Sequence, residues 1–215
     1  MTSSTTSRSA RPRSTPGAID LTAIVKHLSD TLPADAIVTN GAGNYATWAH
    51  RFFRYKKFRT QLAPTSGSMG YGLPAAVAAK IAAPDRQVVC FSGDGCLMMT
   101  VQELATAVQF GAPIVVIVFN NGIYGTIRMH QERHYPGRVS GTDMVNPDFA
   151  DLARAFGGHG ETVRKTEEFA PAFQRAVASG KVSVIDLKVD PEALTTRATL
   201  SEIRAQALKK QQAAQ

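Results

Sequence analysis

The sequence has no long hydrophobic run and very little cysteine. The longest uninterrupted apolar stretch, 114–119, is far shorter than the roughly 20 residues that a membrane-spanning helix requires. Cys90 and Cys96 are the only cysteines, too few for a disulfide framework and without the spacing of a metal-binding pair. We therefore expect a soluble, cytoplasmic protein from a reducing compartment.

The two cysteines have different interpretations. Cys90 lies inside an apolar run and is interpreted as a small core residue. Cys96 lies near a possible helix N-terminus, which would lower the pKa of a thiol. Because no partner base accompanies Cys96, a catalytic thiol is the less favoured interpretation.

Acidic residues are scarce as well, since 17 Asp and Glu face 24 Lys and Arg and the net charge is +7. The first 17 residues contain Arg8, Arg11 and Arg13 and no acid. Transit peptides share this composition, but few apolar residues are present to form an amphipathic face. We therefore expect residues 1–18 to be a disordered basic leader.

A second basic segment, His50–Arg59, interleaves five Lys or Arg with aromatic residues. Such a segment could stack on a single nucleic-acid strand and neutralise its phosphates. No other recognition motif supports that function. We interpret the segment as a surface element whose aromatic rings pack inward, and expect neither a nucleic-acid nor a membrane partner.

The length of 215 residues and the apolar periodicity predict one α/β domain. Asp20 is expected to cap the first helix, and Thr100 and Glu103 have the spacing of a capping box. Apolar strands separated by a helix predict right-handed crossovers between parallel strands. The expected fold is a doubly wound, mostly parallel sheet with helices on both faces. Expected helices are 20–32, 74–82, 101–110, 148–156, 166–179 and a terminal tail within 191–215; expected strands are 36–39, 87–92, 114–119 and 182–189.

Asp94 and Asn121 each follow the end of a predicted strand. In a parallel sheet these ends lie at one edge, where ligands bind. Carboxylate and amide oxygens suit magnesium, and a backbone carbonyl after Asn121 could be a third ligand, leaving about three of six positions for phosphate and water. Gly93 and Gly95 would let the backbone approach an anion at a helix start. Together these features predict a metal-bridged diphosphate site.

Two other motifs have competing interpretations. The turn 41–46 fits the dinucleotide fingerprint G-x-G-x-x-G/A. That fingerprint expects an acid about 20 residues later to hold a ribose. No acid occurs between Asp35 and Asp85, so only an NADP site based on arginine stays open. His130 and His134 have zinc-compatible spacing, but no third ligand is evident, and a solvated or substrate-facing pair is favoured.

A family resemblance is carried by Gly93-Asp94-Gly95 followed after 24 residues by Asn120-Asn121. This pattern resembles the thiamine diphosphate motif of the acetolactate synthase and 2-oxo acid decarboxylase superfamily. The likeness extends over Ile19–Arg204, and three segments resemble acetolactate synthase catalytic subunits: Gly67–Ala76, Val101–Thr106 and Pro191–Leu200. The resemblance implies thiamine diphosphate and Mg²⁺ as cofactors, a binding domain over 19–190 and a helical tail over 191–215.

The resemblance also implies roles for individual residues. Asp94, the Asn121 side chain and the Ile123 carbonyl would bind the metal. The diphosphate would be approached by backbone groups of two turns, one at Gly43 and one at Gly95. The Gly67 carbonyl would accept a hydrogen bond from the aminopyrimidine of the cofactor. Met69 would pack beneath the cofactor and hold it in a bent conformation. The full implied cofactor-binding set is Gly43, Asn44, Tyr45, Gly67, Ser68, Met69, Gly93, Asp94, Gly95, Cys96, Asn121, Ile123 and Tyr124.

The resemblance covers only the last third of a typical member. In the family, a glutamate on a separate pyrimidine-binding domain activates the cofactor, and nothing here resembles that domain or the flavin-binding domain. We expect no flavin, a pyrimidine-binding domain as partner, and a homo- or hetero-oligomer. The cofactor face should expose apolar surface around Met69, Tyr71 and Leu73.

The expected activity is that of a carboligase or decarboxylase acting on 2-oxo acids. Residues 122–131 depart from the substrate-lining sequence of acetolactate synthases, which leaves the donor substrate open. His130 is the one candidate catalytic residue on this chain. The alternative function is a non-catalytic or regulatory module that retains the diphosphate site.

Overall fold

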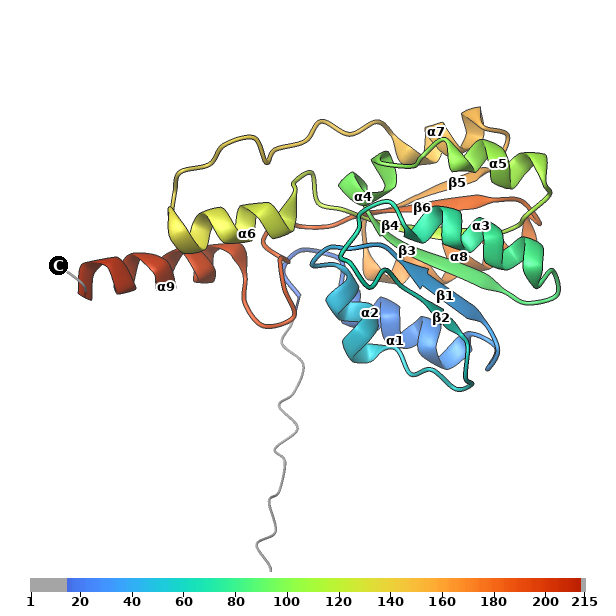
Figure 1. Ribbon diagram of the computed structural model, residues 1–215, viewed down its shortest axis with the longest axis horizontal. Coiled ribbons are helices and arrows are strands. Elements are labelled where there is room, and N and C mark those ends of the chain that lie inside the picture. The colour runs from blue at the N-terminus through green and yellow to red at the C-terminus, as the bar shows by residue number, and fades with distance from the viewer. Residues whose placement is uncertain (1–14, 214–215) are drawn as a thin grey trace, which may run out of the picture.

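The computed structural model describes residues 15–213, which form a six-stranded sheet with every pairing parallel (Figure 1). The order across the sheet is β2-β1-β3-β4-β6-β5. The predicted α/β fold with a parallel sheet is confirmed. The strands are β1 (Ile37–Asn40), β2 (Gln61–Leu62), β3 (Val88–Gly93), β4 (Val115–Asn120), β5 (His159–Val163) and β6 (Ser183–Lys188).

Helices cover both faces because side chains of the central strands alternate between two cores. Val89 and Phe91 of β3 face a core with α1 (Leu21–Thr31), α2 (Ala46–Phe52) and α8 (Thr166–Ala178). Val88 and Cys90 face the opposite core, with α3 (Gly72–Ala82), α5 (Glu103–Gln109) and α7 (Phe149–Ala155). Figure 1 shows α5 and α7 above the sheet, α3 in front of its strands, and α1 and α2 beneath it. Every residue of β3 and β4 is buried.

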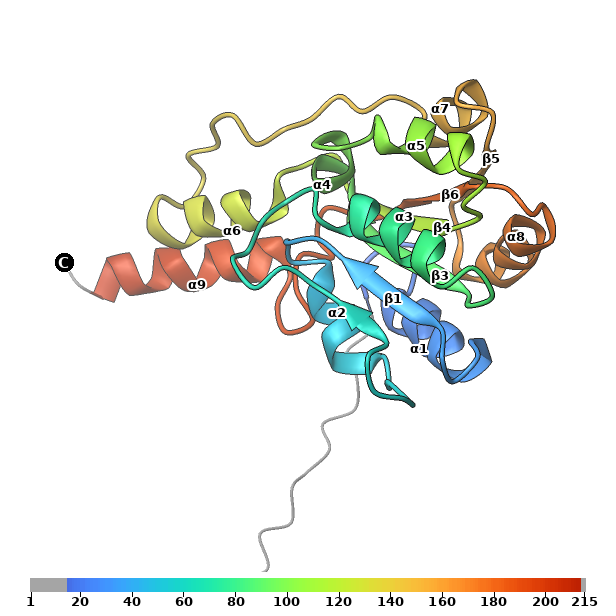
Figure 2. The same cartoon turned by 45° about the vertical axis from the view of Figure 1, so that its right-hand side comes forward.

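A pair of helices lies beyond the carboxyl ends of the strands. These are α6 (Gly125–His134) and α9 (Leu200–Ala213), which lie side by side at one end of the molecule (Figures 1 and 2). They share a small apolar core of Ile123, Met129, Leu194, Leu200 and Ile203. The tail predicted over 191–215 is helical only from Leu200 onward, and residues 191–199 form a loop that reaches the pair.

Local signals predicted some ends of elements and missed others. The Asp20 cap is confirmed, since its carboxylate accepts hydrogen bonds from the backbone of Thr22 and Ala23. The capping box of Thr100 and Glu103 is wrong. The Thr100 hydroxyl donates instead to the Gly70 carbonyl at 2.9 Å. The short helix α4 (Asp94–Met98) starts directly at the end of β3, where a helix start near Cys96 was considered, but the expected helix began only at residue 101. The elements α2, β2, β5 and α6 were also not predicted.

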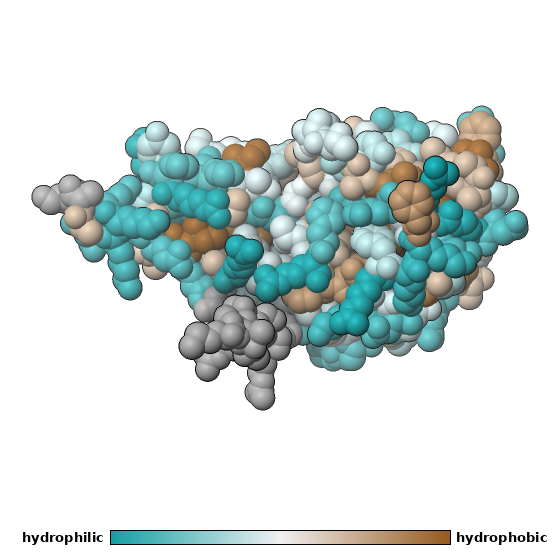
Figure 3. Space-filling model, turned by 60° about the horizontal axis from the view of Figure 1, so that its bottom comes forward, coloured by the Kyte–Doolittle hydropathy of each residue, from teal (hydrophilic) through white to brown (hydrophobic). Residues whose placement is uncertain are grey.

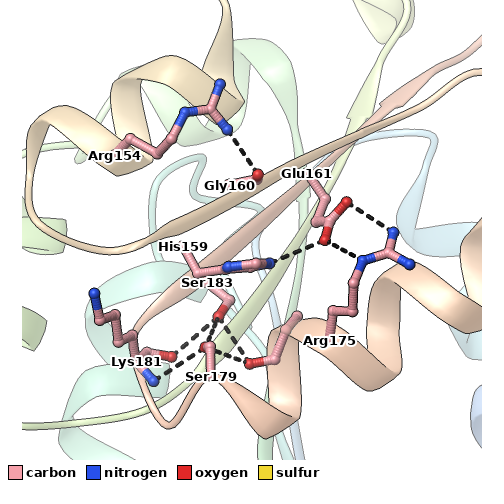
Figure 4. A network of polar contacts seen from close by, with 9 residues as sticks. Arg154, His159, Gly160, Glu161, Arg175, Ser179, Lys181 and Ser183 are labelled. Atoms are coloured by element: carbon pink, nitrogen blue, oxygen red, sulfur yellow. Dashed lines mark hydrogen bonds and ion pairs between the residues drawn. The ribbon is translucent and has the colours of Figure 1, made fainter.

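The edge strand β5 is attached by polar contacts rather than by apolar alternation. Glu161 accepts hydrogen bonds from Arg175 of α8 at 2.7 and 2.9 Å and lies 3.1 Å from the His159 ring (Figure 4). The Arg175 guanidinium is the main reason that the pKa of Glu161 lies below its usual range. Arg154 of α7 donates to the Gly160 carbonyl at 2.7 Å. These contacts connect the strand to helices on both faces.

Several expectations concern surfaces. No helix within residues 15–213 is long and apolar enough to cross a membrane. In the basic segment 50–59, Phe52, Phe53 and Tyr55 pack against the core, as the surface interpretation predicts, whereas Phe58 is 89% exposed. Leu73, expected on an exposed apolar face, is buried in the core beneath α3. Residues 1–14 of the predicted leader lie outside the described residues.

Candidate cofactor and metal site

A cavity lies at the carboxyl edge of the sheet, between the turn after β1 and the turn after β3. The chain runs outward in opposite directions from these two strands, so this edge is the switch point where ligands bind in such folds. The cavity lining includes eleven of the thirteen residues that the sequence singled out: Gly43, Asn44, Tyr45, Met69, Gly93, Asp94, Gly95, Cys96, Asn121, Ile123 and Tyr124. Gly67 and Ser68 are exposed in the neighbouring loop and do not line it.

Asp94 is the buried carboxylate of the cavity, with 3% of its surface exposed. Its Oδ1 accepts a hydrogen bond from the Gly95 N–H at 2.9 Å, and its Oδ2 accepts one from the Gly122 N–H at 2.8 Å. Burial raises the pKa of Asp94, and these hydrogen bonds oppose that shift. The carboxylate is therefore held in one orientation by neutral donors.

Asn146 is a third donor to Asp94 and was not predicted from the sequence. Its Nδ2 lies 2.8 Å from Asp94 Oδ2 and 2.9 Å from Asn120 Oδ1. Asn120 in turn donates to the buried Asp186 at 3.0 Å, and Lys188 pairs with the same carboxylate at 2.6 Å. The only local signal at Asn146 is its place before Pro147 and a helix cap, which says nothing about Asp94.

Asn146 reaches the site because residues 139–147 run as a strap across the loop after β4. The Tyr124 N–H donates to the Thr142 carbonyl and the Met144 N–H to the Gly122 carbonyl, both at 2.9 Å. Arg128 of α6 holds the strap through the Thr142 hydroxyl at 2.7 Å. The strap thereby holds the loop that carries Asn121 in place.

The donor set fits a hard divalent cation. Asn121 lines the same cavity as Asp94, and its Oδ1 accepts a hydrogen bond from the Ile123 N–H at 3.2 Å. A carboxylate, an amide oxygen and a nearby carbonyl are ligands that magnesium prefers. Asp94 has no cationic partner in the described part of the chain, so a bound cation would balance its buried charge. Across residues 15–213, no group of three His, Cys, Asp or Glu is arranged to hold a metal.

The glycines of the cavity are required by close packing. A Cβ on Gly95 would lie 2.7 Å from the ring of Tyr124, and one on Gly93 would lie 2.9 Å from the ring of Tyr45. Both distances are shorter than side-chain contacts allow. The two positions that flank Asp94 therefore have space for backbone only.

Cys96 of α4 contacts two other segments of the chain through its sulfur atom and also lines the cavity. Its Sγ accepts hydrogen bonds from the Gly70 N–H at 3.2 Å and from the Tyr45 hydroxyl at 3.3 Å. Burial raises the pKa of Tyr45 well above its usual range, so this hydroxyl stays protonated and donates. The geometry favours a packing role for Cys96 over a catalytic thiol. Cys90 is fully buried, and burial raises its pKa to about 12.

His130 and His134 lie on α6 outside the cavity. Both are exposed, and their rings stack with centroids 6.4 Å apart. The structure therefore does not bring His130 to the cavity that holds Asp94.

Comparison with known proteins gives the family context. Residues 41–187 match the family described as thiamine pyrophosphate enzyme, C-terminal TPP binding domain. The acetolactate synthase large subunit of Corynebacterium glutamicum is 40% identical over 177 residues, which are 79% of this chain and 28% of that protein. The isozyme 2 large subunit of Escherichia coli is 36% identical over 169 residues, covering 78% of this chain and 31% of that protein.

A solved structure gives the same relation. The thiamine diphosphate-dependent 4-hydroxybenzoylformate decarboxylase of Rhodococcus jostii RHA1 superposes with a TM-score of 0.73 at 30% identity, over 86% of this chain and 34% of that one. The chain thus spans about a third or less of the length of the relatives it matches.

Proposed function

Because this chain belongs to the thiamine pyrophosphate enzyme family through its C-terminal TPP-binding domain, we propose that it holds Mg²⁺ and the cofactor diphosphate in an acetolactate synthase-like carboligase or decarboxylase of 2-oxo acids. The observation that carries the proposal is the convergence of Asp94, Asn121 and the turn at Gly43 on one cavity. The binding domain would span residues 19–190, with 191–215 as its helical tail.

Each part of the site has a defined task in this proposal. Asp94, the Asn121 amide oxygen and the Ile123 carbonyl hold the metal, which neutralises the diphosphate. Gly95 already uses its N–H for Asp94, so its contribution is the absence of a side chain. The turn 43–45 and Cys96 supply the remaining backbone wall. When bound, the cofactor supplies a carbon nucleophile for the keto carbon of the substrate.

The proton transfer that activates the cofactor requires a further partner. Asp94 is the one carboxylic acid among the described residues that line the cavity, and a metal ligand is not available to exchange protons. We propose that a pyrimidine-binding domain on another chain supplies the acid, in a homo- or hetero-oligomer. A regulatory module that keeps the diphosphate site is the second candidate function, favoured by this same lack of a second acid.

Isothermal titration with thiamine diphosphate tests the site. Wild type should bind only with Mg²⁺, and Asp94→Ala and Asn121→Ala should each weaken binding by on the order of 100-fold or more. Asp85→Ala is the matched control, because Asp85 is exposed in the turn before β3, at the opposite edge of the sheet. Equal affinity for wild type and Asp94→Ala would reject the assignment.

A second measurement separates the two functions. The chain is mixed with a separately produced pyrimidine-binding domain of a relative, and carbon dioxide release from 2-oxo acids is followed. Release that depends on Asp94 supports the enzyme. Mg²⁺-dependent cofactor binding without release in any such mixture favours the regulatory module.

A further inference from the structure

A second, larger cleft lies between α2, α6, α9 and the loop 195–198, separate from the cofactor cavity. The two share no lining residue, although the loop 191–199 contributes to the wall of each. Figures 1 and 2 show α6 and α9 extending beyond the sheet near α2, so three segments distant in sequence enclose this cleft.

The charges of the cleft all have one sign. The cleft is lined by four cationic side chains: Arg51 of α2, Arg133 of α6, Lys210 of α9 and Arg197 of the loop. Its lining also includes the imidazole rings of His50 and His134. No Asp or Glu is among its described lining residues. Like charges on one concave surface focus a positive potential and attract anions. Figure 3, which brings the lower side forward, shows mainly hydrophilic side chains at the α9 end.

The cations of this cleft differ in their pairing from four other arginines of the described residues. The guanidinium groups of Arg128, Arg154, Arg175 and Arg204 each pair with a carboxylate. In contrast, Arg51, Arg133 and Lys210 make no ion pair within residues 15–213. A multivalent anion in the cleft would supply these three cations with the negative charge that no carboxylate within residues 15–213 supplies.

Neutral groups of the cleft indicate what else the ligand carries. Hydroxyl groups line the cleft at Thr47, Thr195 and Thr196. The Oγ1 of Thr195 accepts a hydrogen bond from the Ala198 N–H at 2.9 Å, and this bond orders the loop. Ala198, Ile203 and Ala207 form an apolar strip along the same cleft. An anionic group beside a less polar body would match both features.

We propose that this cleft binds a small molecule carrying phosphate groups with two or more negative charges. The site goes beyond the cofactor function and does not depend on Asp94. A guanidinium binds carboxylate and phosphate oxygens alike in a bidentate manner. It is the gathering of cations from α2, α6 and α9 around one cleft that favours a phosphate group with two or more charges over a single carboxylate.

Calorimetric titration with sodium tripolyphosphate in EDTA tests the proposal, because EDTA removes the metal needed at the other cavity. The double variant Arg133→Gln/Lys210→Gln should bind tripolyphosphate about tenfold more weakly or worse. Arg164→Gln/Lys181→Gln is the matched control and should bind as wild type does. Both of these cations are exposed, one directly after β5 and one before β6, and neither lines the cleft. Equal weakening in both double variants, or in neither, overturns the proposal.

Three further arms complete the test. Citrate that binds as tightly as tripolyphosphate would show recognition of charge alone and would overturn the phosphate assignment. A single-stranded oligonucleotide that binds more tightly through the same two cations would reassign the cleft to nucleic acid. The double variant Arg133→Gln/Lys210→Gln, called the cleft variant, should bind thiamine diphosphate with Mg²⁺ as tightly as wild type does. This control distinguishes a wrong assignment of the cleft from a wrong assignment of the cofactor site.

Folding of the cleft variant is checked without ligand. Arg133 and Lys210 are both exposed, so their replacement should leave the thermal midpoint unchanged or raise it by relieving repulsion. Lys210→Gln alone, in the last helix, is the second variant and should show a smaller loss of tripolyphosphate affinity. If neither the single variant nor the double variant binds tripolyphosphate more weakly than wild type, the site is rejected.

Discussion

The side-chain amide of Asn146 connects the carboxylate of Asp94 to the side chain of Asn120. Its nitrogen lies 2.8 Å from Asp94 Oδ2 and 2.9 Å from Asn120 Oδ1, so both of its protons have an acceptor. Asn120 is oriented by its own bond to the buried Asp186. Because these side chains hold one another through a network of hydrogen bonds, the orientation of the Asp94 carboxylate depends on Asn146.

Asn146→Asp should therefore be more harmful than Asn146→Ala. The new carboxylate would face two acceptors, one of them charged, whereas alanine only removes two hydrogen bonds. Alanine should lower the free energy of unfolding by about 1–3 kcal/mol and aspartate by more. Urea unfolding measures both, and titration should show that Mg²⁺-dependent cofactor binding is weakened most in Asn146→Asp. An aspartate variant as stable as the alanine variant would contradict this role.

The sequence predicted the parts of the fold that local patterns determine. Buried strands such as β3 and the Asp20 cap follow from neighbouring residues. The Asp94 and Asn121 pair was predictable because parallel strands end at one edge. Asn146 was not, since its contact with Asp94 spans 52 residues and depends on the strap. Thr100 was assigned wrongly because a tertiary acceptor, the Gly70 carbonyl, replaces the local one.

Gly41 and Cys96 should be energetically coupled. A Cβ on Gly41 would lie 2.2 Å from Cys96 Sγ, which its bonds to Gly70 and Tyr45 hold in place. Gly41→Ala should destabilise the fold by about 1–3 kcal/mol through overpacking. Cys96→Ala makes space for the methyl group, so the double variant should be less destabilised than the sum of the single variants. Urea unfolding of all four proteins gives the coupling, and strict additivity would contradict the contact.

Glu132 and Arg204 should make the α6–α9 pair sensitive to acid. Glu132 is buried, and Arg204 is the main reason that its pKa lies below the usual range. A carboxyl whose pKa is lower in the folded state stabilises the fold above its unfolded pKa, and this stability is lost as pH falls through the folded pKa.

The thermal midpoint of wild type should therefore fall as pH drops below about 4.3, the ordinary glutamate value. Glu132→Gln should remove part of that dependence, and Arg204→Gln should destabilise at neutral pH by on the order of 2 kcal/mol, because it leaves a buried charge unpaired. Glu167→Gln, at an exposed position of α8, is the control and should keep the wild-type profile. A Glu132→Gln profile identical to wild type would contradict this account.

The purified chain should self-associate through the apolar surface next to the cofactor cavity. Met69, Tyr71 and Met99 are 38%, 37% and 48% exposed, and Gly70 packs against Met99, which places these side chains near one another. Met69 also lines the cavity, so a chain that covers this surface would cover the site. Exposed apolar patches of this kind normally mark an interaction surface.

Met99→Lys should lower the association constant measured by sedimentation velocity, because burial of a charge opposes the contact. Phe58→Lys is the matched control, since Phe58 is 89% exposed in the basic segment and its replacement introduces the same charge elsewhere. A monomer at every concentration, or equal effects of both lysines, would contradict the assignment of the surface. Pyruvate consumption is followed on the same samples and should be absent. If Asp94 holds the metal, as proposed, no other described carboxylic acid lines the cavity for proton transfer. Steady turnover by the chain alone would mean that a residue of this chain performs that transfer, and His130→Ala would then be the first variant to test.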